Sequence, residues 1–385
     1  MEYRKFGKTG LKLSVFTLGT MRFLHGWEEP YDELPEDSLE HAHQVIQAAL
    51  DAGFNLIETA EGYGKSEAII GQTLPKLTHP RSSYKVMTKS SPAESADAMR
   101  RQVEAALKRL NLDHIELFAV HGINTPELVT ETLKRNGCME GLEQMRDEGI
   151  IGHLGFATHA PVSTVLEAIR SDRFSFVNMH YYALRTEKKA ALDLAASMDM
   201  GVFIISPNDK GGRLYEPSEK LRQLTEPLHP AVYNERWILA HPHVHTMSVG
   251  VSEPGHVDLH LESLKRRPFW GAEERRAQSR LLAAQVDSEL DRCANGCREC
   301  LPCPERIAIP DLLRLDHYRQ TLDMALYSTF RYGMMNPDDH WMPGAKGDIC
   351  TRCDECLPRC PQSLPIPDLL FKAHEAMHQD DPKES

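Results

Sequence analysis

Along the first 265 residues, short apolar runs alternate with longer stretches whose apolar residues recur at helical spacing. The short runs are rich in β-branched and aromatic residues, a composition typical of strands. There are eight of them: FTLGTM, FNLIET, YKVMTK, IELFAVH, GHLGFATH, FVNMHY, GVFIISP and HTMSVGV. Eight strands, each followed by a helix within about 250 residues, predict a (β/α)8 TIM barrel, because an open doubly wound sheet seldom needs so many even units.

The clearest of the predicted helices spans residues 92–110. Its apolar residues share one face: Met99, Val103, Ala106, Leu107 and Leu110. Ser91 and Glu94 have the spacing of a capping box, and Pro92 suits the first helical position. We therefore expect this helix to begin at Pro92.

Ahead of the first strand, the segment YRKFGKTGLKLS places Gly10 between two short strand-like pieces. This pattern predicts an N-terminal hairpin that closes the bottom of the barrel. No G-x-G-x-x-G sequence follows a predicted strand, so a Rossmann dinucleotide site is unsupported.

The sequence predicts two domains, a barrel over residues 1–265 and a smaller domain over 286–385, joined by a linker over 266–285. The charged run over 272–290 is expected to form a helix that leads into Cys293. Farther on, IAIPDLLRLDHYRQT is nearly repeated as SLPIPDLLFKAHEAM. This repeat predicts a mainly helical C-terminal domain built from a duplicated half.

The C-terminal region contains eight of the nine cysteines, arranged in two runs that each end in Cys-Pro. The second run has the spacing C-x2-C-x2-C-x3-C-P of bacterial ferredoxins, in which the fourth thiolate reaches the other cluster. The first run reads C-x3-C-x2-C-x2-C-P. We predict two 4Fe-4S clusters in a ferredoxin-like domain, with Cys303 or Cys360 completing the opposite cluster. The predicted ligands are Cys293, Cys297, Cys300, Cys303, Cys350, Cys353, Cys356 and Cys360.

Two alternatives to iron–sulfur clusters are zinc and disulfides. Zinc ribbons use two C-x2-C pairs for each metal and have no third cysteine in each run, and disulfides need an oxidising compartment. Cys138 stands apart from both runs and is expected to be an ordinary thiol.

The formal net charge of −12 argues against nucleic-acid binding, which depends on basic patches. The N-terminus has no apolar signal region and no stretch approaches the roughly 20 apolar residues of a membrane span, so we expect a cytoplasmic protein without membrane contact. Residues 286–385 carry 18 acidic and 11 basic residues. This acidic tail would suit a basic or neutral protein partner, or it is a solvated surface that favours solubility.

Polar side chains stand at the ends of consecutive predicted strands, and a barrel brings these ends to one rim. They are Glu58, Lys89, His121, Thr158, His159, Asn178 and His180, with Tyr63 five residues beyond Glu58. Each alone is explained as a satisfied loop residue, but the series together indicates an active site.

The segment 1–265, which contains these polar residues, resembles the aldo-keto reductases. The stretches that carry the resemblance are FGKTGLKLSVFTLGTM, AGFNLIETAEGYGKSEAIIG, VMTKSS, LFAVHG, GFATH and IISPNDKGGRL. The resemblance implies a (β/α)8 barrel that reduces aldehydes and ketones with NADPH through an Asp, Tyr, Lys and His tetrad. Tyr63, Lys89 and His121 match the family's Tyr, Lys and His, and Glu58 stands in place of its Asp.

Carbonyl reduction explains these residue types. Hydride delivery to carbon leaves charge on oxygen, so a proton donor must stand nearby, and Tyr63 would be that acid. We expect the Lys89 ammonium to lower the pKa of the phenol, Glu58 to keep Lys89 charged, and His121 to polarise the carbonyl.

The resemblance also assigns cofactor-binding residues, listed as Thr158, His159, Asn178, Ser206, Lys210, Gly211, Gly212, Arg213 and Ser252. Three positions depart from the family. Ile205 replaces an aromatic ring that stacks on nicotinamide, Glu253 lies where basic residues grip the 2′-phosphate, and His260 replaces an Asn that contacts adenine. The expected cofactor is therefore NADPH, NADH or flavin mononucleotide (FMN), which the barrel's phosphate site would also suit.

Two functions follow from the sequence. The first is an oxidoreductase that reduces a small-molecule carbonyl, or oxidises the alcohol, coupled to two clusters. The C-terminal region resembles helical ferredoxin-like modules attached to some bacterial aldo-keto reductase-like oxidoreductases. The second is an electron-transfer or redox-responsive binding protein, whose barrel binds flavin or no nucleotide and positions the cluster domain for a partner, with an external electron carrier as one possible partner. Nicotinamide gives electrons in pairs while a cluster accepts one, so exchange between them needs a converter such as a flavin.

Overall fold

The computed structural model of this chain describes residues 1–25, 31–286, 290, 293, 296–338 and 341–378. Contacts divide it into two compact units. The first comprises Met1–Tyr181, Lys188–Pro207 and Glu235–Phe269, and the second comprises Tyr182–Glu187, Asn208–Asn234 and Trp270–Ser385. The second unit thus includes two segments from the sequence region that we assigned to the barrel.

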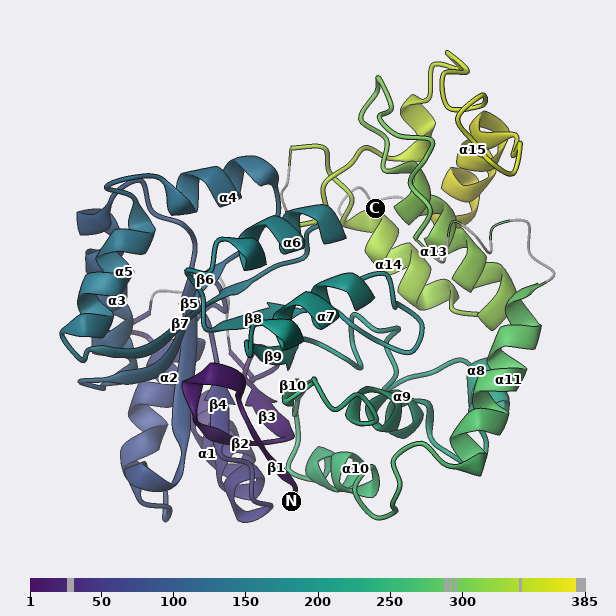
Figure 1. Ribbon diagram of the computed structural model, residues 1–385. Coiled ribbons are helices and arrows are strands. Elements are labelled where there is room, and N and C mark those ends of the chain that lie inside the picture. Colours follow the sequence, from purple (N-terminus) through teal and green to yellow (C-terminus); the bar gives the residue numbers. More distant parts are fainter. Residues whose placement is uncertain (26–30, 287–289, 291–292, 294–295, 339–340, 379–385) are drawn as a thin grey trace. The chain divides into compact units, whose positions relative to one another are not determined.

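The first unit is a closed barrel of eight parallel strands in the order β10-β3-β4-β5-β6-β7-β8-β9, which confirms the predicted architecture (Figure 1). All eight predicted runs form strands. They are β3 (Phe16–Gly19), β4 (Leu56–Glu58), β5 (Lys85–Ser90), β6 (Ile115–His121), β7 (Ile151–Ala157), β8 (Phe176–Met179), β9 (Gly201–Ile204) and β10 (Thr246–Gly250). Sequential strands pair side by side, so their C-terminal ends share one rim.

Helices follow the strands along the chain. They are α1 (Glu36–Asp51), α2 (Ser66–Thr73), α3 (Ala96–Leu110), α4 (Pro126–Leu133), α5 (Cys138–Asp147), α6 (Val162–Arg170), α7 (Lys189–Ser197), α8 (Glu219–Thr225), α9 (Pro230–Leu239) and α10 (His256–Glu262). Short 3-10 turns lie at Gly7–Thr9, Leu74–Lys76 and Arg81–Ser83. The predicted start of α3 was wrong. Ser95, not Ser91, caps this helix, because its side chain accepts a hydrogen bond from the backbone N–H of Ala98.

The predicted hairpin is present as β1 (Tyr3–Lys5) and β2 (Lys12–Ser14). Phe6, from its turn, is fully buried in a core cluster with Phe176, at the start of β8, and Phe203. Gly201 is a glycine for a steric reason, since a Cβ there would lie 2.7 Å from the Phe6 ring. The hairpin therefore closes the end of the barrel opposite the rim.

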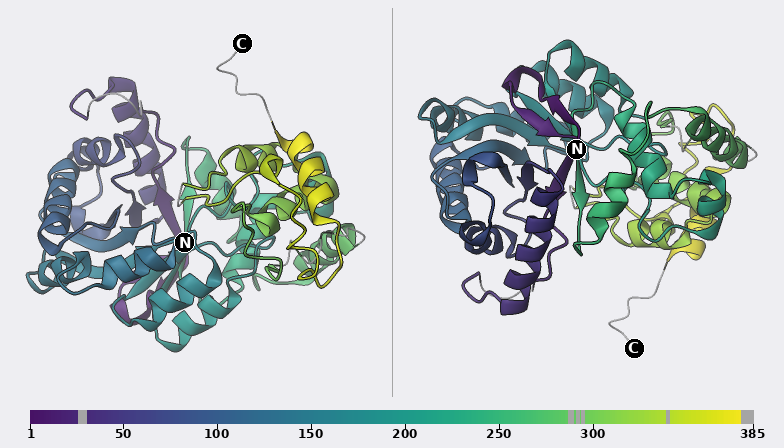
Figure 2. Two further views of the ribbon diagram at one scale, coloured as in Figure 1. Left: turned by 90° about the horizontal axis from the view of Figure 1, so that it is seen from above. Right: turned by 90° about the horizontal axis from the view of Figure 1, so that it is seen from below.

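The C-terminal helices are α11 (Ala272–Val286), α13 (Ile309–Leu322), α14 (Ala325–Gly333) and α15 (Ile366–Met377), with a 3-10 turn at Gly347–Ile349. Residues 287–289 of the expected helix over 272–290 lie outside the described residues. As the repeat predicts, α13 and α15 both begin with Ile-Pro-Asp-Leu-Leu. These two helices and α14, drawn in yellow-green to yellow, lie side by side in Figure 2.

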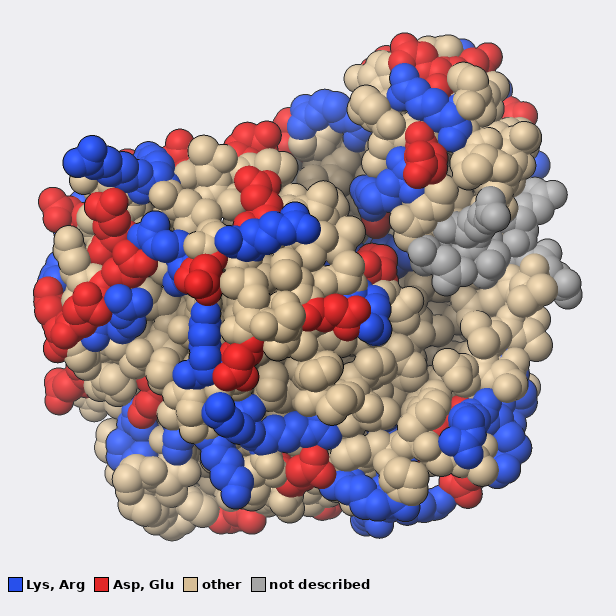
Figure 3. Space-filling view, viewed as in Figure 1, with Lys and Arg blue, Asp and Glu red and all other residues tan. Residues whose placement is uncertain are grey.

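Charge is mixed over the face shown in Figure 3, where acidic and basic side chains alternate rather than separate. Among the described residues, no helix is long and apolar enough to cross a membrane.

Candidate active site

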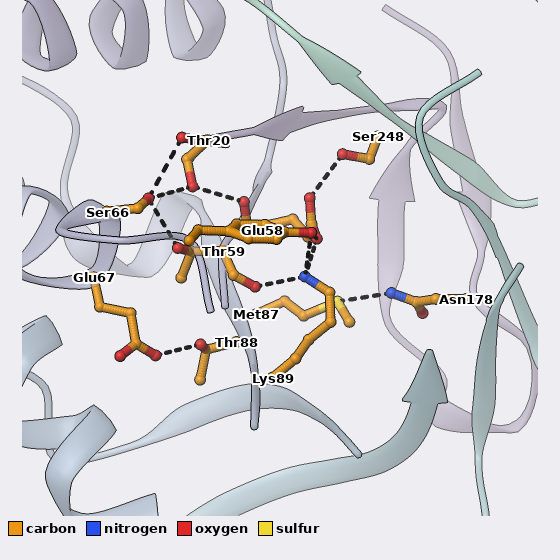
Figure 4. Close-up of polar contacts among 11 residues, drawn as sticks. Thr20, Glu58, Thr59, Ser66, Glu67, Met87, Thr88, Lys89, Asn178 and Ser248 are labelled. Carbon is orange, nitrogen blue, oxygen red and sulfur yellow. Dashed lines mark hydrogen bonds and ion pairs between the residues drawn. The ribbon is translucent and has the colours of Figure 1, made fainter. Parts of the chain in front are cut away.

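A buried ion pair joins Lys89 and Glu58. Lys89 lies near the C-terminal end of β5 and Glu58 ends the neighbouring strand β4, so both side chains start from the barrel rim. Their side chains are only 1% and 3% exposed. The Lys89 ammonium donates to Glu58 Oε1 and, at 2.7 Å, to the carbonyl oxygen of Thr59 (Figure 4). Such a pair is stable in a dry site only when further hydrogen bonds complete both charges.

Ser248 provides that completion for the carboxylate. Its hydroxyl, on β10, donates to Glu58 Oε2 at 2.7 Å (Figure 4). The lack of a side chain at Gly19 makes space for this hydrogen bond, because a Cβ there would lie 2.4 Å from Ser248 Oγ and 3.3 Å from Glu58 Oε2. Ser248 was not among the residues predicted from the sequence, where its one sign is a polar residue inside the apolar run HTMSVGV.

Tyr63 follows β4 in the turn before α2 and adds its hydroxyl to this pair. Lys89 Nζ donates to the Tyr63 oxygen at 3.3 Å, and Tyr63 donates to Glu58 Oε1 at 3.4 Å. His121, the last residue of β6, meets the Tyr63 ring edge-on with 5.9 Å between the ring centroids. The structure thus brings all four predicted catalytic side chains together.

The acidity of Tyr63 differs from our expectation. Burial raises the pKa of Tyr63 well above its usual value, and the neighbouring charge of Glu58 raises it further. Burial also lowers the pKa of Lys89, while Glu58 acts in the opposite direction. The net shift is therefore opposite in direction to the lowered phenol pKa that we expected, because burial is its largest cause and Glu58 adds to it.

A second group of predicted residues lies at the ends of β7 and β8. Thr158 donates from its hydroxyl to the Ile123 carbonyl oxygen at 2.6 Å. The His159 ring stacks on that of His180 with a centroid separation of 4.6 Å, and their ring nitrogens are hydrogen-bonded. Asn178 is fully buried, and its Oδ1 has no hydrogen-bond partner among the described residues. An orphaned buried carbonyl oxygen needs an N–H donor, such as that of a ligand amide.

The remaining predicted cofactor residues are distributed over both units. Ser206 and Ser252 belong to the barrel unit, where Ser252 Oγ lies 3.2 Å from His256 Nδ1. The segment Lys210, Gly211, Gly212 and Arg213 belongs to the second unit. His260, placed by resemblance beside adenine, is instead fully buried and hydrogen-bonded to Glu235 at 2.7 Å.

The cysteines of the C-terminal region group across the two runs. Cys303, from the first run, lines a pocket with three cysteines of the second run, Cys350, Cys353 and Cys356. Burial and the neighbouring sulfurs of Cys350, Cys303 and Cys353 raise the pKa of Cys356.

The other four cysteines also lie near one another, and Cys300 in addition neighbours Cys356. Burial raises the pKa of Cys293 to about 12, with added contributions from Cys300, Cys297 and Cys360. All nine cysteines are free of disulfide bonds. Within the described part of the chain, no three His, Cys, Asp or Glu side chains are arranged to hold a metal ion.

Known proteins are similar to part of this chain. The sequence model of the Aldo/keto reductase family matches residues 16–230. An uncharacterized oxidoreductase of Bacillus subtilis, YrpG, is 29% identical over 232 residues, which cover 54% of this chain and 66% of the relative. An NADH-specific methylglyoxal reductase of Escherichia coli is 27% identical over 236 residues, covering 55% of this chain and 68% of the relative.

Among solved structures, the holo form of an aldo-keto reductase from Bacillus halodurans superposes with a TM-score of 0.61 at 21% identity. The match covers 73% of this chain and 96% of that protein. At this identity the superposition establishes the fold.

Proposed function

Since the chain belongs to the aldo/keto reductase family, an oxidoreductase family, we propose that it reduces a small-molecule aldehyde or ketone with a nicotinamide cofactor and that Tyr63 donates the proton. The observation that carries this proposal is the convergence of Tyr63, Lys89, Glu58 and His121 at the barrel rim. The similarity to a methylglyoxal reductase makes methylglyoxal the first substrate to test.

The proposed roles follow from charge. When bound, the nicotinamide supplies hydride to the carbonyl carbon, and the C=O bond becomes a C–O single bond with negative charge on oxygen. Tyr63 transfers its proton to that oxygen and becomes a phenolate. Lys89, 3.3 Å from the phenol oxygen, hydrogen-bonds to the phenolate, and the Glu58 carboxylate keeps Lys89 protonated. His121 orients the substrate oxygen, and solvent returns the proton to Tyr63.

Residues of each unit, taken separately, fit part of a nicotinamide cofactor. In the barrel unit, the unpartnered Oδ1 of Asn178 can accept from the carboxamide N–H₂ group, next to Thr158 and His159. In the second unit, the segment Lys210–Arg213 carries two basic side chains and two glycines, residue types that bind phosphate oxygens.

Direct hydride transfer is tested with NADPH and NADH that carry deuterium at C4 of the dihydronicotinamide. With methylglyoxal, the proposal predicts that deuterium appears on the former carbonyl carbon of the product. Product that carries only solvent hydrogen at that carbon would refute direct hydride transfer and indicate electron delivery by another route.

We further propose that the cysteines bind two 4Fe-4S clusters that exchange their fourth ligands. One ligand set is Cys293, Cys297, Cys300 and Cys360, and the other is Cys303, Cys350, Cys353 and Cys356. The grouping across runs supports this assignment, and the spacing of the second run is that of ferredoxins.

The same grouping favours a second candidate function, the transfer of single electrons between the clusters and an external carrier. The test is an anaerobic visible spectrum of the purified protein. Loss of the cluster band with dithionite but not with NADPH is expected if the clusters exchange electrons only with a carrier. A spectrum without a cluster band would refute the cluster assignment.

A further inference from the structure

The segment proposed to hold phosphate packs against α14, the helix that lies between the two cysteine runs. Both belong to the second unit, although they are more than 100 residues apart in sequence. Three residues of the segment lie against α14. One of them lies near the N-cap residue of this helix, and the other two contact residues within it. The contacts pair Gly212 with Met324, Lys210 with Tyr327, and Arg213 with Phe330.

These contacts differ in kind. The Tyr327 hydroxyl donates to the Lys210 carbonyl oxygen at 3.0 Å. The Arg213 guanidinium lies 5.5 Å from the centroid of the Phe330 ring, within cation–π range. Because residues 324, 327 and 330 are three apart, they share one side of the helix.

The segment needs this support because its backbone is unusual. Gly212 has φ of +135° and Arg213 has φ of +52°, a left-handed conformation that is costly for arginine. A short local bond from the Arg213 N–H to the Asp209 carbonyl oxygen, 2.7 Å, closes the turn. The Tyr327 hydrogen bond then fixes the turn to the helix.

An adjacent side of α14, with Ser328 and Tyr332, is tied to the cysteine-bearing chain. The Tyr332 hydroxyl accepts from the backbone N–H of Gly347 at 3.1 Å, three residues before Cys350. Ser328 donates to the Leu315 carbonyl oxygen on α13 at 2.7 Å. One short helix therefore contacts both the proposed phosphate segment and the backbone just before Cys350, a proposed cluster ligand.

We propose that α14 positions the Lys210–Arg213 segment for cofactor phosphate, with Tyr327 as the positioning residue, and thereby links nucleotide affinity to cluster retention. This inference rests on the proposed function. Linkage is reciprocal: if an intact cluster region favours the binding conformation of the segment, bound nucleotide must stabilise the cluster region by the same free energy.

The test compares Tyr327→Phe with Tyr318→Phe in the cluster-containing protein. Tyr318 is a matched control, because its hydroxyl also donates to a backbone carbonyl oxygen in the second unit, that of Leu184, outside the phosphate segment. Loss of one such hydrogen bond at Lys210 is expected to weaken NADPH binding about fivefold to tenfold by titration calorimetry, with less than about twofold for the control. Urea unfolding checks that both variants lose similar stability.

Cluster retention gives a second readout. NADPH is expected to slow the release of iron to a chelator in the wild type and the control, and to slow it less in Tyr327→Phe. Equal NADPH affinity in all three proteins, or equal weakening in both variants, would overturn the inference. A wild type that binds neither NADPH nor NADH would instead overturn the proposed function.

Discussion

At the scale of single residues, Glu58 is the position at which this site differs from the tetrad that the family resemblance implies. It has one more methylene than the aspartate that the family resemblance implies, and the structure accommodates the longer side chain by giving its second oxygen to Ser248. The sequence could predict Tyr63, Lys89, His121 and Glu58 from matching stretches. It could not predict Ser248, because that contact joins strands 190 residues apart and leaves no local pattern.

The raised pKa of Tyr63 predicts the pH dependence of reduction. In the proposed mechanism, reduction uses the protonated phenol, so a pKa above 10 would keep the donor available as pH rises from 7 to 10. Glu58→Gln removes a charge that raises this pKa, so its rate should begin to fall at lower pH than that of the wild type. Steady-state rates across this range provide the measurement, and coincident alkaline limbs would contradict the charge argument.

Ser248→Ala should reduce turnover without removing the catalytic acid. A hydrogen bond to a charged group contributes about 1.5–3 kcal/mol, and releasing Glu58 misplaces Lys89, so we expect kcat to fall at least about tenfold. Thr246→Val, on the same strand as Ser248, is the matched control, because it removes a buried hydroxyl contact with Thr17 of β3 at 2.7 Å. The same kcat in both variants would contradict this role of Ser248.

At the scale of elements, periodicity predicted the barrel because every strand is an apolar run followed by a helix. The predicted ends of the helices were less accurate. Ser91 and Ser95 both precede the apolar face of α3, and only the hydrogen bond from the Ala98 N–H identifies Ser95 as the cap. The hairpin was also predictable, whereas the side-chain packing by which it closes the barrel was not. His245 illustrates this, since its ring packs edge-on against Phe6 at 5.8 Å and accepts from the Val202 N–H at 2.9 Å.

His245 should make the barrel sensitive to acid. Burial lowers its pKa from 6.5 to about 4, so the folded state binds its proton only below the pH at which the unfolded chain does. Stability is therefore full above pH 6.5 and is lost as pH falls toward 4. Between pH 7 and pH 5 the loss is about 2 kcal/mol, which His245→Asn should largely remove. Urea unfolding of both proteins at the two pH values measures it, and equal losses would contradict the assignment.

At the level of the complete chain, the helical repeat predicted a mainly helical C-terminal region, and the cysteine runs predicted that this region binds two clusters. The assignment of Tyr182–Glu187 and Asn208–Asn234 to the second unit could not be predicted. Those segments follow barrel strands in sequence, and only side-chain contacts such as that of Tyr327 with Lys210 reveal where they pack.

Ligand exchange between the proposed clusters is testable with paired substitutions. Cys303→Ala with Cys353→Ala should remove one cluster and leave about half the iron, because both residues belong to one proposed set. Cys303→Ala with Cys297→Ala should remove both clusters. Iron and sulfide analysis distinguishes the outcomes, and the opposite result would show that each run binds its own cluster.

Carbonyl reduction with Tyr63 as acid is tested most directly by NAD(P)H oxidation with methylglyoxal, measured for the wild type and Tyr63→Phe. We expect turnover by the wild type and a loss of about 100-fold to 10,000-fold in the variant, with nucleotide affinity retained. Tyr84→Phe, directly before the start of β5, should retain activity. Equal turnover by the wild type and Tyr63→Phe would show that Tyr63 is not the acid.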